Sequence, residues 1–200
     1  MIFIRWCKGS LKQDKHGAKI SIRALYIRTN PRMNLSNLFD KAKNSKRHRW
    51  LLTYSLNRFI PFNKAHRFKV EALGDTFLRI KVPYRKSNLN HLKGIHACAQ
   101  ATAAEISSGL LLIARLDPKR YRLILQKLDL EYHYQAKNSV TARFEADDDW
   151  LQDRIFEPLE QSDRVYVDCP IDLYDEEENL VASAIARWQI KDWQAVRTKV

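Results

Sequence analysis

The stretch NHLKGIHACAQATAAEISSG, residues 90–109, decides the fold that we expect for this chain. It begins with residues typical of a loop: Asn88 lies just before the stretch, Asn90 is its first residue, and Gly94 marks a bend. An apolar run with helical spacing then extends to about Arg115, where Asp117-Pro118 ends it. We therefore expect one long, unusually apolar helix at the centre of the chain.

Small side chains recur along this helix at spacings of four, three and four residues, at Ala97, Ala101, Ala104 and Ser108. A stripe with so little bulk allows a helix axis to approach a sheet closely. The surrounding segments supply the sheet, because their apolar and polar residues alternate with a period of two. We expect strands within residues 75–85, 121–135, 140–147, 163–175 and 179–190.

Two of these strands are predicted to form a hairpin, with Lys137-Asn138-Ser139 as the turn. The last two are joined through the acidic residues 176–179, and the acidic residues 147–163 form a partly helical surface connection. One long helix against one curved antiparallel sheet is an α+β fold. Ordinary helix packing in another α+β domain fits the same pattern.

The positive charge is concentrated at the N-terminal end of the chain. Residues 1–49 hold 13 Lys or Arg and 2 Asp or Glu, whereas residues 50–200 hold 22 and 21. The formal net charge of +12 is thus a property of an arm, which is solvated or contacts anionic lipid or nucleic acid.

Met33 is an alternative native start. We expect three regions: a basic arm over 1–33, an amphipathic helical segment over 34–60 that ends before Pro61, and the folded domain over 61–195.

The cysteines and the N-terminal sequence bear on the location of the protein. Cys7, Cys98 and Cys169 include no CxxC pair, which argues against a disulfide framework and for a reducing compartment. An arginine interrupts the apolar patch of the first residues, so they do not resemble a signal peptide. No apolar run reaches the roughly 18 residues of a membrane span. We expect a cytoplasmic protein without such a span. Cys98 is expected to be a small buried thiol rather than a nucleophile activated by the helix N-terminus, because no dedicated base is evident.

This layout resembles the hotdog fold of acyl-CoA thioesterases, in which a curved sheet of five or six strands wraps a central helix. The resemblance covers about residues 62–193. In the phenylacetyl-CoA thioesterase-like branch, an asparagine precedes a His-Gly-Gly at the helix start, and an acidic residue follows nine positions after that histidine. Asn90, His96 and Glu105 reproduce this spacing. The stretches FIPFNKAHRFKV (59–70) and PYRKSNLNHLKGIHACA (83–99) are more similar still to an uncharacterised hotdog family, DUF4442.

The resemblance implies a site shared by two subunits. Hotdog proteins dimerise with antiparallel central helices, so the carboxylate of one chain faces the helix start of the other. Glu105 would be the general base or nucleophile, with Asn90 and His96 orienting substrate or water. The first-turn amides of Ala97 and Cys98 would stabilise the oxyanion. These two residues replace the Gly-Gly of the well-studied branch, and their Cβ atoms narrow the approach to the amides.

Each of these site residues also has a structural interpretation. Glu105 could pair with a basic neighbour at a dimer interface, His96 could bond the backbone at the helix start, and Asn90 could shape the loop. His91 and His96 lack the spacing of a helical zinc motif, and no nucleotide-binding motif is present, so we expect no metal and no cofactor. Four basic residues are candidates for binding the phosphates of CoA: Arg85, Lys86, Lys93 and Arg120.

Two functions therefore stay open. The first is an acyl-CoA or acyl-carrier thioesterase that acts as a homodimer, with further pairing into tetramers left undecided. The second is a non-catalytic hotdog module that binds acyl-CoA or serves as an assembly scaffold, which Ala97-Cys98 favours. A hotdog hydratase is not distinguished from the first. Nucleic-acid binding by the arm is the least supported interpretation.

Overall fold

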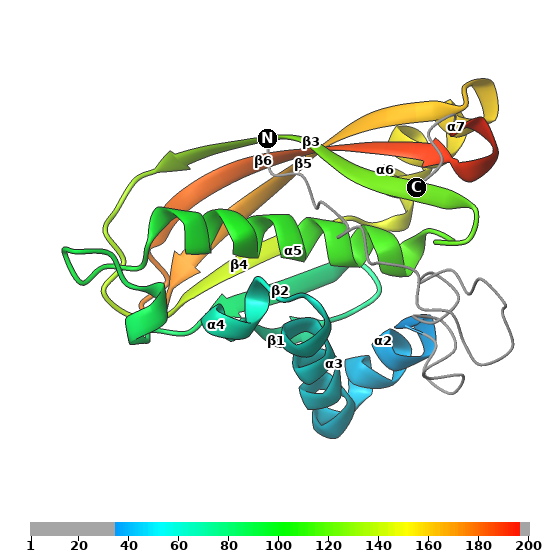
Figure 1. Ribbon diagram of the computed structural model, residues 1–200. Helices are drawn as coiled ribbons and strands as arrows, with labels where there is room; N and C mark the ends of the chain where they lie inside the picture. The colour runs from blue at the N-terminus through cyan, green and yellow to red at the C-terminus, as the bar shows by residue number, and fades with distance from the viewer. Residues whose placement is uncertain (1–34, 197–200) are drawn as a thin grey trace, which may run out of the picture.

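The computed structural model describes residues 35–196, in which short N-terminal helices precede one sheet and one long helix (Figure 1). α2 (Leu35–Asn44) and α3 (Lys46–Phe59) follow one another, and α4 (Asn63–His66) leads into the first strand. The predicted helical segment that ends before Pro61 is thereby confirmed. The basic arm and the alternative start lie outside the described residues.

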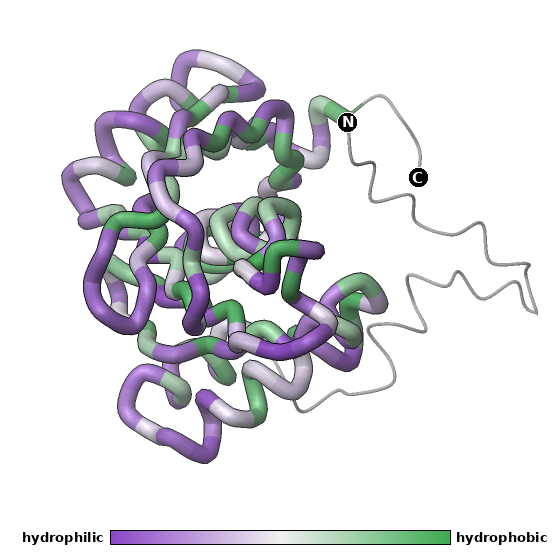
Figure 2. The backbone as a smooth tube through the Cα atoms, turned by 90° about the vertical axis from the view of Figure 1, so that its left-hand side faces the viewer, coloured by the Kyte–Doolittle hydropathy of each residue, from purple (hydrophilic) through white to green (hydrophobic). Residues whose placement is uncertain are grey.

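Six strands form a single sheet in the order β1-β2-β4-β5-β6-β3, and each neighbouring pair is antiparallel. The strands are β1 (Lys69–Leu73), β2 (Phe77–Val82), β3 (Tyr121–Tyr132), β4 (Val140–Glu145), β5 (Arg164–Asp175) and β6 (Leu180–Asp192). The long helix α5 (Ala97–Arg115) lies on the concave side of the sheet, and Figure 2 shows it end-on within the arc of strands. This arrangement is the hotdog architecture expected from the sequence.

Two details of the predicted sheet are wrong. β1 was not expected, and the hairpin between the strands on either side of Lys137-Asn138-Ser139 does not form, because β3 pairs with β6 while β4 lies between β2 and β5. The backbone just after β3 still bonds to β6, since the N–H of His133 donates to the carbonyl of Val181 at 2.9 Å. β3 is therefore held at the edge of the sheet, and the segment 133–139 carries the chain back to the centre.

The face of α5 that packs against the sheet differs from the predicted stripe of small residues. Ala104 and Ser108 are buried as expected, but Ala97 is exposed and Ala101 is only half-buried. A close approach occurs at Gly109, where an added Cβ would lie 2.7 Å from the ring of Trp188. The indole nitrogen of Trp188 donates to Ser108 Oγ at 3.0 Å. At this point the helix and β6 are held together by the close glycine contact and by the hydrogen bond of Trp188.

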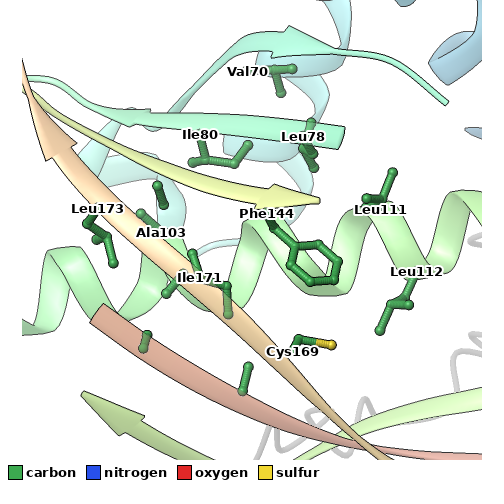
Figure 3. Packing of buried hydrophobic residues seen from close by; sticks show 14 of the residues in the cluster. Val70, Leu78, Ile80, Ala103, Leu111, Leu112, Phe144, Cys169, Ile171 and Leu173 are labelled. Carbon is green, nitrogen blue, oxygen red and sulfur yellow. The ribbon is translucent and has the colours of Figure 1, made fainter. Parts of the chain in front are cut away.

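The core lies between α5 and the concave face of the sheet (Figure 3). Leu111 and Leu112 of α5 are fully buried, as are Phe144 of β4 and Ile171 of β5. By length and hydropathy α5 could cross a membrane, which the sequence analysis did not anticipate. Because 56% of its most apolar window is buried inside the fold, the core accounts for that apolar character.

The acidic connection between β4 and β5 is partly helical, as predicted. It consists of α6 (Asp148–Leu151), a π-helical turn (Gln152–Phe156) and α7 (Glu157–Gln161). Leu151 and Ile155 are buried and anchor it to the core.

Candidate functional site

The loop between β2 and α5 is organised by one fully buried side chain, Asn88. Its amide nitrogen donates to the carbonyls of His66 and Pro83 at 3.0 and 2.9 Å, and its amide oxygen lies 3.0 Å from His66 Nδ1. Its own carbonyl accepts from the N–H of His96 at 2.8 Å. Asn88 therefore fixes the position of the helix start. The sequence analysis treated it only as a loop signal, because asparagine is common in exposed loops.

Asn90 shapes the turn that follows. Its side-chain oxygen accepts from the N–H groups of Leu92 and Gly94 at 2.9 and 3.0 Å, which is an Asx-type turn. Lys93 has a positive φ of 60°, and its carbonyl accepts from the hydroxyl of Tyr84 at 2.6 Å. The side-chain oxygen of Asn90 is thus occupied by hydrogen bonds within the loop. Only the NH₂ group of this side chain is left to donate to a ligand.

His96 is the N-cap residue of α5, with extended backbone angles. Its Nδ1 accepts from the N–H of Cys98 at 3.1 Å, so in the neutral ring the proton is assigned to Nε2. Its carbonyl accepts from the N–H groups of Ala99 and Gln100 at 3.0 and 3.3 Å. The imidazole therefore caps the helix through one nitrogen and keeps an N–H donor on the other.

The two amides proposed for the oxyanion are not equivalent. The N–H of Cys98 is already donated to the ring of His96, whereas within the described residues the N–H of Ala97 has no acceptor. Both residues are exposed, so the expectation that Cys98 is a buried thiol is wrong. An exposed first turn with one free amide remains for a ligand.

Tyr132, at the end of the edge strand β3, contacts the first turn of α5. Its hydroxyl donates to the carbonyl of Ala97 at 3.1 Å. Burial, and to a smaller extent the Cys98 thiol, raise the pKa of Tyr132 above its ordinary value. The sequence analysis assigned Tyr132 only to a strand face, since nothing in the local pattern shows that this strand end meets the helix start.

Glu105 lies at mid-helix and is half-buried. Burial raises the pKa of the Glu105 carboxyl above its ordinary value of 4.5. Among residues 35–196 no hydrogen bond or ion pair reaches this carboxylate. Glu105 is eight residues from Ala97, or about 12 Å along the helix at the usual rise. It therefore does not meet the helix start of its own chain.

Glu105 lies one helical turn before Gly109, so it is on the side of α5 that Trp188 contacts further along the helix. Its neighbours Ala101, Thr102 and Ile106 are all half-buried, and we call these four residues the open face of α5. The edge strand β3 bonds only to β6, so one side of its twelve-residue backbone is unpaired within the described chain. A half-buried helix face and a long free strand edge are features that a second subunit would cover.

The four basic candidates are divided between the two ends of α5. Arg85, Lys86 and Lys93 lie in the loop that leads to the helix start. Arg120 follows the other end, beyond a helix about 28 Å long. There it lies 3.6 Å from a carboxylate oxygen of Asp192 and lines a shallow hollow. The structure therefore groups three of the four with the helix start.

Gln100 is a further polar residue near the helix start, which the sequence analysis did not single out. It is only 3% exposed, and its Nε2 donates to the carbonyl of Ile95 at 3.4 Å, while its Oε1 has no partner among the described residues. The described residues contain no group of three or more His, Cys, Asp or Glu side chains suited to a metal ion.

Comparison with known proteins bears on this geometry. A family model described as a domain of unknown function, DUF4442, matches residues 48–190. Comparison with curated proteins finds no similar sequence.

Several solved structures share the fold. A Pseudomonas aeruginosa protein of unknown function, described as a probable thioesterase, is 24% identical with a TM-score of 0.65, covering 72% of this chain and 95% of its own. A Haemophilus influenzae thioesterase is 13% identical with a TM-score of 0.55, covering 83% and 96%. A Staphylococcus aureus thioesterase, solved as a glutamine-to-alanine variant, is 14% identical with a TM-score of 0.52, covering 66% and 98%. These similarities establish the fold.

Proposed function

Because the chain belongs to the DUF4442 family and has the hotdog fold, we propose that it is a thioester hydrolase that acts on acyl-CoA or acyl-carrier thioesters at a homodimer interface. The observation that carries the proposal is Glu105, a half-buried carboxylate without a partner in the described chain. A group with these properties suits proton transfer near neutral pH.

The proposed dimer joins the free edges of two β3 strands and places the open faces of two α5 helices against each other, antiparallel. Glu105 of one chain then faces the exposed first turn of α5 in the other chain. It cannot reach the first turn of its own helix, which lies about 12 Å away along the helix axis. Two features support this assembly: the unpaired edge of β3 and the half-buried side chains beside Glu105.

In the proposed reaction, Glu105 takes a proton from a water molecule whose oxygen attacks the thioester carbonyl. The carbonyl oxygen becomes negative in the tetrahedral intermediate and accepts from the free N–H of Ala97, near the positive end of the helix dipole. The C–S bond then breaks, and the leaving thiolate takes the proton back from Glu105. The products are a carboxylic acid and a thiol.

The other residues at the helix start have supporting roles in this proposal. The free Nε2–H of His96 donates to the thioester or to the attacking water, while Nδ1 holds the cap. Asn90 is a positioning residue, because its oxygen fixes the loop. Arg85, Lys86 and Lys93 offer positive charge to the phosphates of CoA on the same side.

A second function, a non-catalytic hotdog module that binds acyl-CoA, is favoured by one specific observation. The amide of Cys98 is donated to His96, so the helix start offers one free first-turn N–H rather than two. A site with a single oxyanion donor binds a thioester carbonyl but stabilises the tetrahedral intermediate less.

The test is a panel of acyl-CoA thioesters of varied chain length, assayed with the wild type and Glu105→Gln. We expect hydrolysis by the wild type and a rate at least about a hundredfold lower in the variant, the size of loss typical when a general base is removed. Glu160→Gln, at an exposed carboxylate of α7 and outside both β3 and α5, is the control and should keep full activity. Ligand binding without turnover, unchanged in Glu105→Gln, would instead establish the non-catalytic module.

A further inference from the structure

The solvent-facing side of α3 carries two aromatic rings and three cations. Trp50 and Tyr54 are 67% and 51% exposed and stack with their ring centroids 5.7 Å apart. Lys46, Arg47 and Arg58 are also exposed. At 3.6 residues per turn, these five residues fall within about 120° of the helix surface. We call them the basic aromatic face.

The fold holds α3 through three side chains that do not belong to this face. Leu52 is buried, and Thr53 Oγ1 accepts from the N–H of Val70 in β1 at 3.0 Å. Asn57 Nδ2 donates to the carbonyl of Phe68 at 2.7 Å. The basic aromatic face is therefore presented on a fixed helix, and the hydrophobic core does not account for its two rings.

The charge around this face is strongly one-sided. In the described part of the chain, no carboxylate pairs with Lys46, Arg47 or Arg58. Residues 1–67 contain 16 Lys or Arg and 2 Asp or Glu, whereas residues 68–200 contain 19 and 21. The N-terminal arm has the same sign as the face, so electrostatics favours an anionic partner over the arm as its cover.

Exposed apolar residues continue beyond the cations. Ile60 and Phe62 are 43% and 56% exposed in the turn between α3 and α4. An aliphatic chain and aromatic rings beside Lys and Arg suit the boundary between lipid headgroups and acyl chains. Single-stranded nucleic acid would use the rings for stacking but would have no use for Ile60.

We propose that the basic aromatic face, with the turn at residues 60–62, binds the surface of an anionic bilayer. The rings of Trp50 and Tyr54 lie at headgroup level, and the three cations contact acidic lipid headgroups. α3 packs against β1, at the sheet edge opposite β3, so this contact leaves the free β3 edge open to a second subunit (Figure 1).

The test measures partition of the full chain onto phosphatidylcholine vesicles with and without 30% phosphatidylserine at physiological salt. Each cation at an anionic surface contributes about fivefold. We therefore expect Lys46→Glu/Arg47→Glu/Arg58→Glu to bind at least a hundredfold more weakly, and Trp50→Ser/Tyr54→Ser at least tenfold more weakly. The matched controls are Lys119→Glu and Ile185→Ser, an exposed cation and an exposed apolar residue elsewhere, which should bind like the wild type.

Circular dichroism and thermal melting establish that each variant is folded. Equal binding to neutral and anionic vesicles, no binding at all, or full binding by both face variants would overturn the proposal. Binding of an oligonucleotide, lost in the face variants without any vesicle binding, would assign the face to nucleic acid and also overturn it. Turnover of a soluble short-chain acyl-CoA separates this proposal from the enzymatic one, because the face variants should keep it while Glu105→Gln loses it and still binds vesicles.

Discussion

Helix α5 is closely packed against the sheet at Ser108, Gly109, Leu111 and Leu112, which we call its sheet side, and it is only half-buried at the open face one to two turns earlier; the two regions are built differently. On the sheet side, Leu111 and Leu112 are fully buried, Gly109 lies against Trp188, and Ser108 accepts the indole hydrogen bond. On the open face, Ala101, Thr102, Glu105 and Ile106 are half-buried, and the carboxylate has no partner in the described chain.

Packing within one chain accounts for the side chains on the sheet side of α5, but it does not account for those on the open face. Each contact on the sheet side lowers the free energy of the folded monomer, because it buries apolar surface or satisfies a polar group. A half-buried, unpaired carboxylate does the opposite, since it loses hydration without gaining a partner. The open face is therefore the part of α5 whose chemistry points to a second subunit or a ligand.

The largest effect that would test this comparison is loss of sheet-side packing. Leu111→Ala should lower the free energy of unfolding by about 3 kcal/mol, from lost burial and an unfilled cavity. Ile106→Ala, on the open face, should cost about 1 kcal/mol in dilute solution, with a cost that grows as protein concentration rises. Urea denaturation at several concentrations measures both. Equal, concentration-independent costs would show that the two faces do not differ.

The sequence predicted the sheet side better than the site. The apolar run to Arg115 and the alternation in β2 were enough to predict an α+β fold with one long helix, because periodicity indicates the type of each element, and the resemblance of residues 90–109 to a known family then indicated the hotdog arrangement. Strand order was less accessible: the Lys137-Asn138-Ser139 turn suggested a hairpin, but β3 pairs with β6 through contacts far apart in sequence. Local patterns carry little information on such pairings.

The candidate site was predicted in part. Spacing and resemblance identified Glu105 and His96, and the structure places His96 as the helix cap. Asn88, Tyr132 and Gln100 were missed, because their importance comes from burial and from partners that only the folded chain brings close. Whether Glu105 meets a helix start stays a prediction about two chains.

The next largest effect concerns the loop that positions the helix start, where order comes from hydrogen bonds rather than from apolar packing. Asn88→Ala should cost about 2 kcal/mol, because it leaves buried carbonyls of His66 and Pro83 without donors. Asn37→Ala, at an exposed position of α2, is the control and should change stability little. Chemical denaturation tests this, and a neutral Asn88→Ala would mean that the loop is held by other contacts.

A smaller effect is expected at the helix cap. His96→Ala should cost about 1 kcal/mol, because the N–H of Cys98 loses its acceptor. His96→Asn should restore that stability, since asparagine is a good N-cap residue. If His96 also orients a thioester, the rate of hydrolysis stays low in His96→Asn although the fold is stable. Full activity in His96→Asn would leave His96 with capping alone.

The smallest effect is a pH dependence that arises on the open face. Burial raises the pKa of folded Glu105 above its unfolded value, so between these two values the native state binds more protons than the unfolded state. The contribution of Glu105 to stability is therefore fully present below about pH 4.5, and it is lost as pH rises through the folded pKa.

Glutamine does not ionise, so Glu105→Gln does not lose stability in this way. As pH rises from 4 to 8, the unfolding free energy of the variant should therefore increase relative to that of the wild type. Urea titrations at each pH measure it, with Glu160→Gln, at an exposed glutamate of α7, as the control. A change for Glu105→Gln no larger than that of the control would mean that the Glu105 carboxylate is solvated in the folded protein. A variant that is more stable at neutral pH but inactive would show that Glu105 lowers stability while it serves the reaction.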